Sequence, residues 1–314
     1  MANTAAEAAR NDFYNQPSQG ILQSIDNNID AAVQMFIFDV FNRLVIDYRA
    51  VIVNLAIVSI LVYAFQIYKG RVGSSIEEVA ERVFVIFIVF ALLFNMGWFI
   101  QFLHTVFMQW PEEIIRSIVS SMSSVTVQNT NQDAIKGTLD VYLDQTWKLG
   151  METANRGSIT SPFPWIMAFW IITIGFLLAV IPFGMSAVAS VATGVLLAMT
   201  PLFLTFLFFK KTTGFFESWI RALMTMMFLK ILAYTVMVLS LFILKSPMSG
   251  MVQKVGIEGE FKMSNYMAFL VSAFVIFMFY RNISGMAAGL GSGFTVQASR
   301  VAESGYGKLR SIVK

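Results

Sequence analysis

Long apolar runs separated by short polar segments dominate the chain from residue 51 onward. Two of these runs, 51–68 and 84–108, reach the roughly 18 residues that a helix needs to cross the hydrocarbon core of a bilayer. Four further apolar segments follow, at 163–181, 183–209, 216–244 and 266–280. Because apolar runs of this length require lipid as their solvent, the pattern predicts an all-α, polytopic helical membrane protein.

The number of crossings depends on the almost uncharged stretch 163–209, which Pro182 divides. This stretch forms either two spans with a very tight turn or one span followed by a re-entrant element. Basic residues place both the loop 69–83 and the C-terminal tail in the cytoplasm, which requires an odd number of crossings. We therefore predict five transmembrane helices with an exported N-terminus. Six crossings with both ends inside are the alternative, and they would export the loop 69–83.

The N-terminal region 1–48 is predicted to be an exported, amphipathic helical region. Its apolar residues, among them Ile25, Ile29 and Val33, recur at spacings of three and four and form one helical stripe. The other faces carry aspartates, whereas helices that lie on a membrane surface favour lysine and arginine. We therefore expect the stripe to contact a protein partner rather than the membrane.

Four more regions complete the predicted organisation. A first transmembrane pair occupies 49–110, and a second transmembrane cluster occupies 163–281. The polar loop 111–162 lies between them and contains one short amphipathic helix with Trp147, and we expect this exported loop to face the partners. The tail 282–314 is rich in Gly and Ala and then basic, so it is predicted to be cytoplasmic.

Composition argues against several classes of chemistry. Of 314 residues, 57% are hydrophobic and 13% are charged, and the net charge of +3 comes from Lys and Arg spread beside the apolar runs. No dense basic patch for nucleic-acid phosphates is visible. The lack of cysteine removes thiolate metal ligands, disulfides and a cysteine nucleophile, and the single histidine, His104, cannot form a ligand cluster. We expect no catalytic, cofactor or metal site.

Lys230 and a run of small residues before it are the candidate functional positions. A charge inside a span is by default a functional hypothesis, although Lys230 and Arg221 can also snorkel to the interface, and that interpretation is favoured. The small and polar residues either line the lumen of an assembled pore or allow close helix packing, and packing is favoured. These residues are Ser186, Ser190, Thr193, Gly194 and Thr200.

Glycines follow the last apolar segment. Gly285 and Gly289 have GxxxG spacing, and Gly291 and Gly293 come directly after them. No Lys-Ser/Thr ending or strand–turn–helix context accompanies them, which argues against a phosphate-binding loop. A hinge or a subunit contact is the favoured interpretation.

The segment 200–232 carries a family resemblance. It reads TPLFLTFLFFKKTTGFFESWIRALMTMMFLKIL, an apolar span with a proline, a basic pair, an aromatic Gly-Phe-Phe-Glu-x-Trp turn and a second apolar run. This arrangement resembles the TrbL-like family, the polytopic inner-membrane channel components of type IV secretion and conjugation machines. The wider order of regions, over roughly residues 20–290, is similar to that family as well.

The resemblance implies a five-crossing protein in the inner membrane of a Gram-negative bacterium. Such a protein would form a homo-oligomeric platform under the pilus or stalk and help DNA or protein substrates across. Its neighbours would be the minor pilin or stalk protein, the bitopic scaffold protein and the secretion ATPase.

A stand-alone small-solute transporter or channel is the alternative. Such proteins often carry internal repeats and midplane ionisable residues. The two halves of this chain show no convincing repeat, and Lys230 has no acidic partner within an apolar run. A membrane enzyme would need a cluster of His, Asp or Glu inside the spans, and none is visible in the sequence.

Overall fold

The computed structural model describes residues 21–70, 76–121, 133–155, 162–255 and 263–312, and the secondary structure of these residues is entirely helical. The chain begins with α2 (Ile21–Tyr68), α3 (Ile76–Phe94) and α4 (Met96–His104). A π-helical turn (Thr105–Gln109) leads into α5 (Trp110–Ser121), and α6 (Asp133–Ala154) follows. The second half consists of α7 (Phe163–Ala198), α8 (Thr200–Thr205), a 3₁₀ turn (Phe206–Phe208), α9 (Thr213–Val255) and α10 (Met263–Ile312).

Four of these helices are long and apolar enough to cross a membrane, over Ser24–Tyr68, Phe163–Ala198, Thr213–Leu244 and Tyr266–Gly293. A fifth crossing is present if Val83–Leu92 and Gly97–Ile118, which meet at an angle of 85°, count as one broken span. The prediction of an all-α polytopic membrane protein is therefore confirmed.

Two apolar segments that the sequence separates belong to one helix. Helix α7 continues through Pro182 to Ala198, so 163–181 and 183–209 are not two spans with a turn between them. A proline removes one backbone hydrogen bond and bends a helix, but it need not end one where neighbouring helices hold both halves. A short element follows, consisting of α8 and the 3₁₀ turn.

The segment 84–108, by contrast, was predicted as one continuous span but is interrupted at Asn95, between α3 and α4. This residue leaves helical geometry with φ −100° and ψ 48°, and its side chain makes no capping hydrogen bond. Asn and the nearby Gly97 are both poor helix formers, so a break here costs little intrinsic stability. At the N-terminus, α2 runs unbroken across residue 48, where the sequence suggested the end of the amphipathic region.

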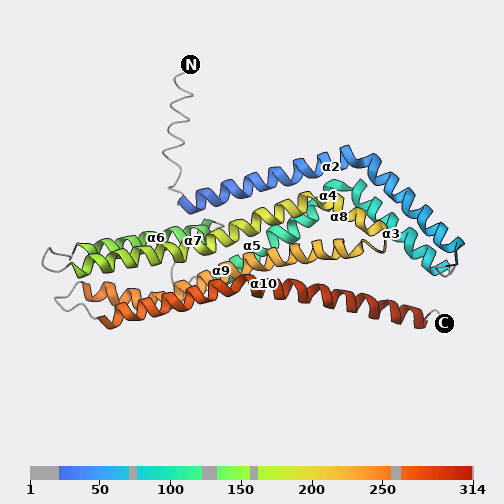
Figure 1. Cartoon of the computed structure of the whole chain (residues 1–314). Coiled ribbons are helices and arrows are strands. Elements are labelled where there is room, and N and C mark those ends of the chain that lie inside the picture. Colours follow the sequence, from blue (N-terminus) through green and yellow to red (C-terminus); the bar gives the residue numbers. More distant parts are fainter. Residues whose placement is uncertain (1–20, 71–75, 122–132, 156–161, 256–262, 313–314) are drawn as a thin grey trace, which may run out of the picture.

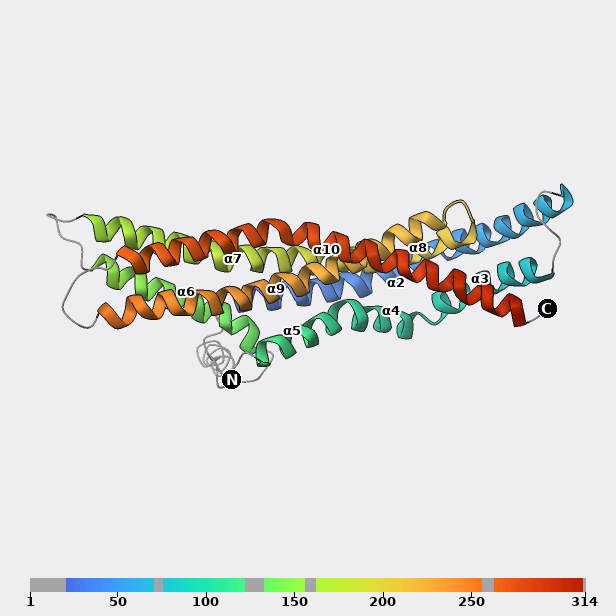
Figure 2. The ribbon, with the colours of Figure 1, turned by 90° about the horizontal axis from the view of Figure 1, so that it is seen from below.

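Helices run lengthwise in an elongated bundle, with α9 beside α10 (Figures 1 and 2). Helix α6 covers the first half of α7, where a Cβ on Gly175 would clash with Thr146. Helix α2 covers the second half, where a Cβ on Gly194 would clash with Val33. The first turn of α2 contacts α6, where the backbone N–H of Leu22 donates to Asp140 Oδ1 (3.2 Å).

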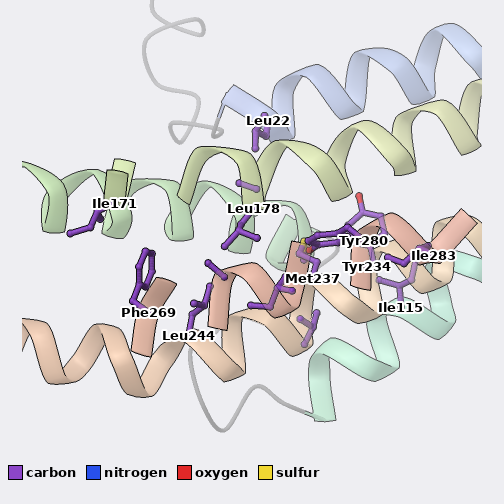
Figure 3. Packing of buried hydrophobic residues seen from close by; sticks show 14 of the residues in the cluster. Leu22, Ile115, Ile171, Leu178, Tyr234, Met237, Leu244, Phe269, Tyr280 and Ile283 are labelled. Atoms are coloured by element: carbon purple, nitrogen blue, oxygen red, sulfur yellow. The ribbon is translucent and has the colours of Figure 1, made fainter. Parts of the chain in front are cut away.

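Two apolar clusters fill the bundle. The first joins α7, α9 and α10 around residues such as Ile171, Leu244 and Phe269 (Figure 3). The second joins α2, α3 and α4 to the ends of α7 and α9, with Phe41 and Phe208 at its centre. Many other large apolar side chains on these helices are exposed, as expected of surfaces that face lipid or another protein.

The crossing of α9 and α10 at Gly291 provides a test of the fold. A Cβ on Gly291 would lie 2.9 Å from the backbone nitrogen of Thr225 and 3.0 Å from its Cα, and backbone atoms cannot move aside as a flexible side chain can. We expect Gly291→Ala to destabilise the protein by about 1–3 kcal/mol, a typical cost of overpacking. Thermal unfolding of the detergent-solubilised protein measures this as a lower midpoint.

Gly289 supplies the matched control on the same helix. Nothing lies within 4 Å of a Cβ at Gly289, so Gly289→Ala should leave the midpoint unchanged or slightly raise it. Equal effects of the two substitutions would contradict the packing of α9 against α10 described above.

Candidate functional site

The most unusual contact in the bundle is an ion pair between Glu112 and Lys230. Lys230 Nζ lies 2.9 Å from Glu112 Oε1. The side chain of Lys230 is 7% exposed and that of Glu112 is 32% exposed, so the pair is buried at its cationic end and reaches the surface at its acidic end. Lys230 therefore does have an acidic partner, contrary to what its apolar run suggested.

Local sequence explains why Glu112 faces α9. Pro111 is the second residue of α5, which continues without a gap from the π-helical turn. Glu112 and Glu113 follow it in the first turn of α5. Glu113 is exposed, whereas Glu112 lies between Met108 and Ile115, which are buried.

The ion pair lies where the two apolar clusters meet. Met108 of the π-helical turn belongs to the second cluster and Ile115 of α5 to the first, with Glu112 between them. On other helices too, polar residues lie between the buried side chains of the first cluster and those of the second. These residues, which we call the polar layer together with the ion pair, are Asp26 and Asp30 on α2, and Ser190 and Thr193 on α7.

His104 borders the polar layer from the end of α4. Its side chain is 8% exposed, its ring lies 6.1 Å from that of Phe38, and its Nε2 atom has no hydrogen-bond partner within the described part of the chain. Charges on Glu112, Lys230 and Asp30 are close enough to interact with it electrostatically. Ionisable groups from four separate segments thus converge on one region.

The small and polar positions of α7 and α8 all lie inside the protein. Ser186, Ser190, Thr193, Gly194 and Thr200 are buried. Gly194 packs against Val33 of α2, and the hydroxyls of Ser186 and Ser190 have no hydrogen-bond partner in the residues that the structure describes.

The positions proposed for partner contact differ in their surroundings. Val33 is buried against α7, and Ile29 is partly buried against the second apolar cluster. Ile25 remains exposed on α2, and Trp147 is exposed on α6.

Segment 200–232 forms a connected set of contacts around Trp219. Pro201 has no N–H for the carbonyl of Leu197, and the hydroxyl of Thr200 donates to that carbonyl instead (2.5 Å). The indole Nε1–H of Trp219 donates to the carbonyl of Leu196 (2.9 Å), and its ring stacks on Phe203 with 5.6 Å between centroids. These contacts therefore connect the start of α9 to α7 and α8, on both sides of the break between them.

Metal ligands do not gather in the described ranges, where no group of three or more His, Cys, Asp or Glu side chains is placed to hold an ion. The polar layer combines acids with a lysine instead.

Comparison with known proteins gives one family. The model of the family described as TrbL/VirB6 plasmid conjugal transfer protein matches residues 56–283, which is well over half of the chain. No curated protein matches the sequence.

Removing one partner of the ion pair tests its contribution to stability. Glu112→Gln leaves the Lys230 ammonium buried without its carboxylate, whereas Lys230→Met leaves a carboxylate that reaches the surface. We expect Glu112→Gln to cost on the order of 2 kcal/mol, less than the roughly 3–5 kcal/mol of a fully buried pair, and Lys230→Met to cost less. Thermal or denaturant unfolding in detergent measures both.

The double variant Glu112→Gln/Lys230→Met should recover part of the loss, because neither charge is left alone. The exposed pair of Lys148 and Asp144 on α6 (2.6 Å) is the control, and Asp144→Asn should change stability little. A Glu112 effect no larger than that of Asp144 would show that the buried pair does not hold α5 to α9.

Proposed function

The chain belongs to the TrbL/VirB6 family of plasmid conjugal transfer proteins, and from this membership we propose that it is the structural and channel subunit of the inner-membrane complex of a type IV secretion (conjugation) system. The family match carries the proposal, because it extends from within α2 to within α10 and includes a part of every helix that can span a membrane. The protein is thus a multi-pass membrane component of a conjugation or secretion system.

The finer proposal concerns location and partners. We place the chain in the inner membrane of a Gram-negative bacterium, beside the minor pilin or stalk protein, the bitopic scaffold protein and the secretion ATPase. DNA or protein substrates pass through in transit, and the subunit itself catalyses no reaction. The resemblance of the segment 200–232 and the order of the helices support this proposal.

A homo-oligomeric platform for pilus or stalk assembly is part of the proposal. Large apolar side chains are exposed on α2, α3, α7 and α10, more than a folded chain leaves in contact with water. On α10, nothing lies within 4 Å of a Cβ at Gly285, Gly289 or Gly293, which leaves a face open to close approach by another helix. Lipid and neighbouring subunits together would cover these surfaces.

A stand-alone small-solute transporter or channel is the second candidate. The buried pair of Glu112 and Lys230 favours it, because paired ionisable residues inside a helical membrane bundle often mark the path of an ion or solute. The family match nevertheless gives priority to the secretion system.

Deleting the gene from a donor strain tests the proposed function. We expect DNA transfer to a recipient to be lost and to return when the wild-type gene is supplied. Gentle extraction should recover the protein in a large assembly with pilin-like and ATPase components, as measured by native mass and by identification of copurifying proteins.

Two controls make the result specific. The same deletion in the recipient should leave transfer unchanged, and a gene carrying Asp144→Asn should restore transfer in full. Normal transfer from the deletion donor, together with a small partner-free particle that moves solutes in proteoliposomes, would overturn the proposal in favour of the transporter.

A further inference from the structure

His104 is a buried ionisable group with an open hydrogen-bonding position. It is the single histidine of the chain and lies at the last residue of α4, directly before the π-helical turn Thr105–Gln109. Its side chain is 8% exposed, and its Nε2 atom has no hydrogen-bond partner in the described part of the structure. A buried polar atom left without a partner calls for a physical explanation.

Burial of the ring opposes a charged imidazolium, whereas the two nearby carboxylates favour it and the nearby ammonium opposes it. Asp30 of α2, Glu112 of α5 and Lys230 of α9 are the groups whose charges reach the ring. Two carboxylates and one ammonium leave one net negative charge, which a proton on His104 would cancel. The buried hydroxyls of Ser186 and Ser190 on α7 carry no charge.

We propose that His104 is a proton-binding site whose occupancy controls the ion pair between Glu112 and Lys230. A proton from the aqueous phase binds to the unprotonated ring nitrogen and forms the imidazolium, and no other bond is made or broken. The acidic end of the ion pair gives access, because Glu112 is 32% exposed whereas Lys230 is 7% exposed.

Proton binding changes the forces on the neighbouring helices. An imidazolium at His104 attracts the carboxylate of Glu112 and repels the ammonium of Lys230, which weakens the contact between α5 and α9. The segment that carries both His104 and Glu112 is bounded by the break at Asn95 and contains the π-helical turn. Irregular turns of this kind often occur at functional sites. When the contact between α5 and α9 weakens, the segment shifts relative to α9 at these two irregular positions.

Proton binding by His104 is a property of this chain alone and does not depend on the chain acting in a secretion system. The single histidine makes the measurement direct. Protein labelled with ¹⁵N-histidine, purified in full length with a tag that contains no histidine and placed in lipid bilayers, gives the ring signals of His104 alone. The ¹⁵N shifts report the protonation state of the ring as the pH is varied.

Three variants test the link to the ion pair. Glu112→Gln removes a negative charge, so His104 should take its proton at a pH lower by roughly one unit, whereas Lys230→Met should raise that pH by a similar amount. The double variant Glu112→Gln/Lys230→Met restores the original net charge, so its midpoint should return close to that of the wild type. This variant also avoids an isolated buried charge and therefore keeps the test open if a single variant does not fold.

Asp144→Asn on α6 is the control, and it should leave the midpoint unchanged because the pair of Asp144 and Lys148 is exposed and screened. Two results would overturn the proposal. One is a ring that stays neutral down to the pH at which the protein unfolds. The other is a midpoint that does not move in opposite directions when Glu112 and Lys230 are replaced singly.

Discussion

A buried ammonium group on α9 constrains the arrangement of the surrounding helices. Lys230 lies among apolar neighbours in a bundle built for lipid, and a charge in such a place is stable only with a partner that is close and well oriented. That partner, Glu112, comes from a different helix, so α5 must lie against α9 at this level. Helix α5 continues from the π-helical turn, and Glu112 lies at the boundary between the two apolar clusters.

Hydropathy alone was enough to predict the fold class, because lipid requires long apolar helices and the chain carries little else. Hydropathy was less informative about where a helix continues and where it is interrupted. Pro182 suggested a turn, yet α7 passes through it, since tertiary packing against α2 and α6 holds both halves of the helix. Asn95 lies in an uninterrupted apolar run and gave no comparable warning, yet the helix breaks there. Hydropathy therefore misjudged both positions, in opposite directions.

The candidate site was only partly predictable for a similar reason. Lys230 and the serines of α7 stood out as polar residues in apolar runs, but the partner of Lys230 lies 118 residues away, and no periodicity links such distant positions. Glu112 lies outside the apolar runs, in the segment 111–162 that was predicted to be a polar loop. The signal that could have joined them is the rule that ionisable residues inside membrane bundles pair with one another. By contrast, the segment around Trp219 was recognisable from the sequence, and the contacts of Trp219 with Leu196 of α7 and Phe203 of α8 connect α9 to both sides of the break between α7 and α8.

The length of the longest helices has a mechanical consequence. Helix α10 has 50 residues and α2 has 48, which at about 1.5 Å per residue makes each of them more than twice as long as the roughly 30 Å hydrocarbon core is thick. Helix α10 continues without interruption over this length, so it can act as a lever whose far end moves when the helix tilts. A small rotation where α9 and α10 cross at Gly291 and Thr225 would therefore be amplified into a larger displacement outside the bilayer, without any local unfolding.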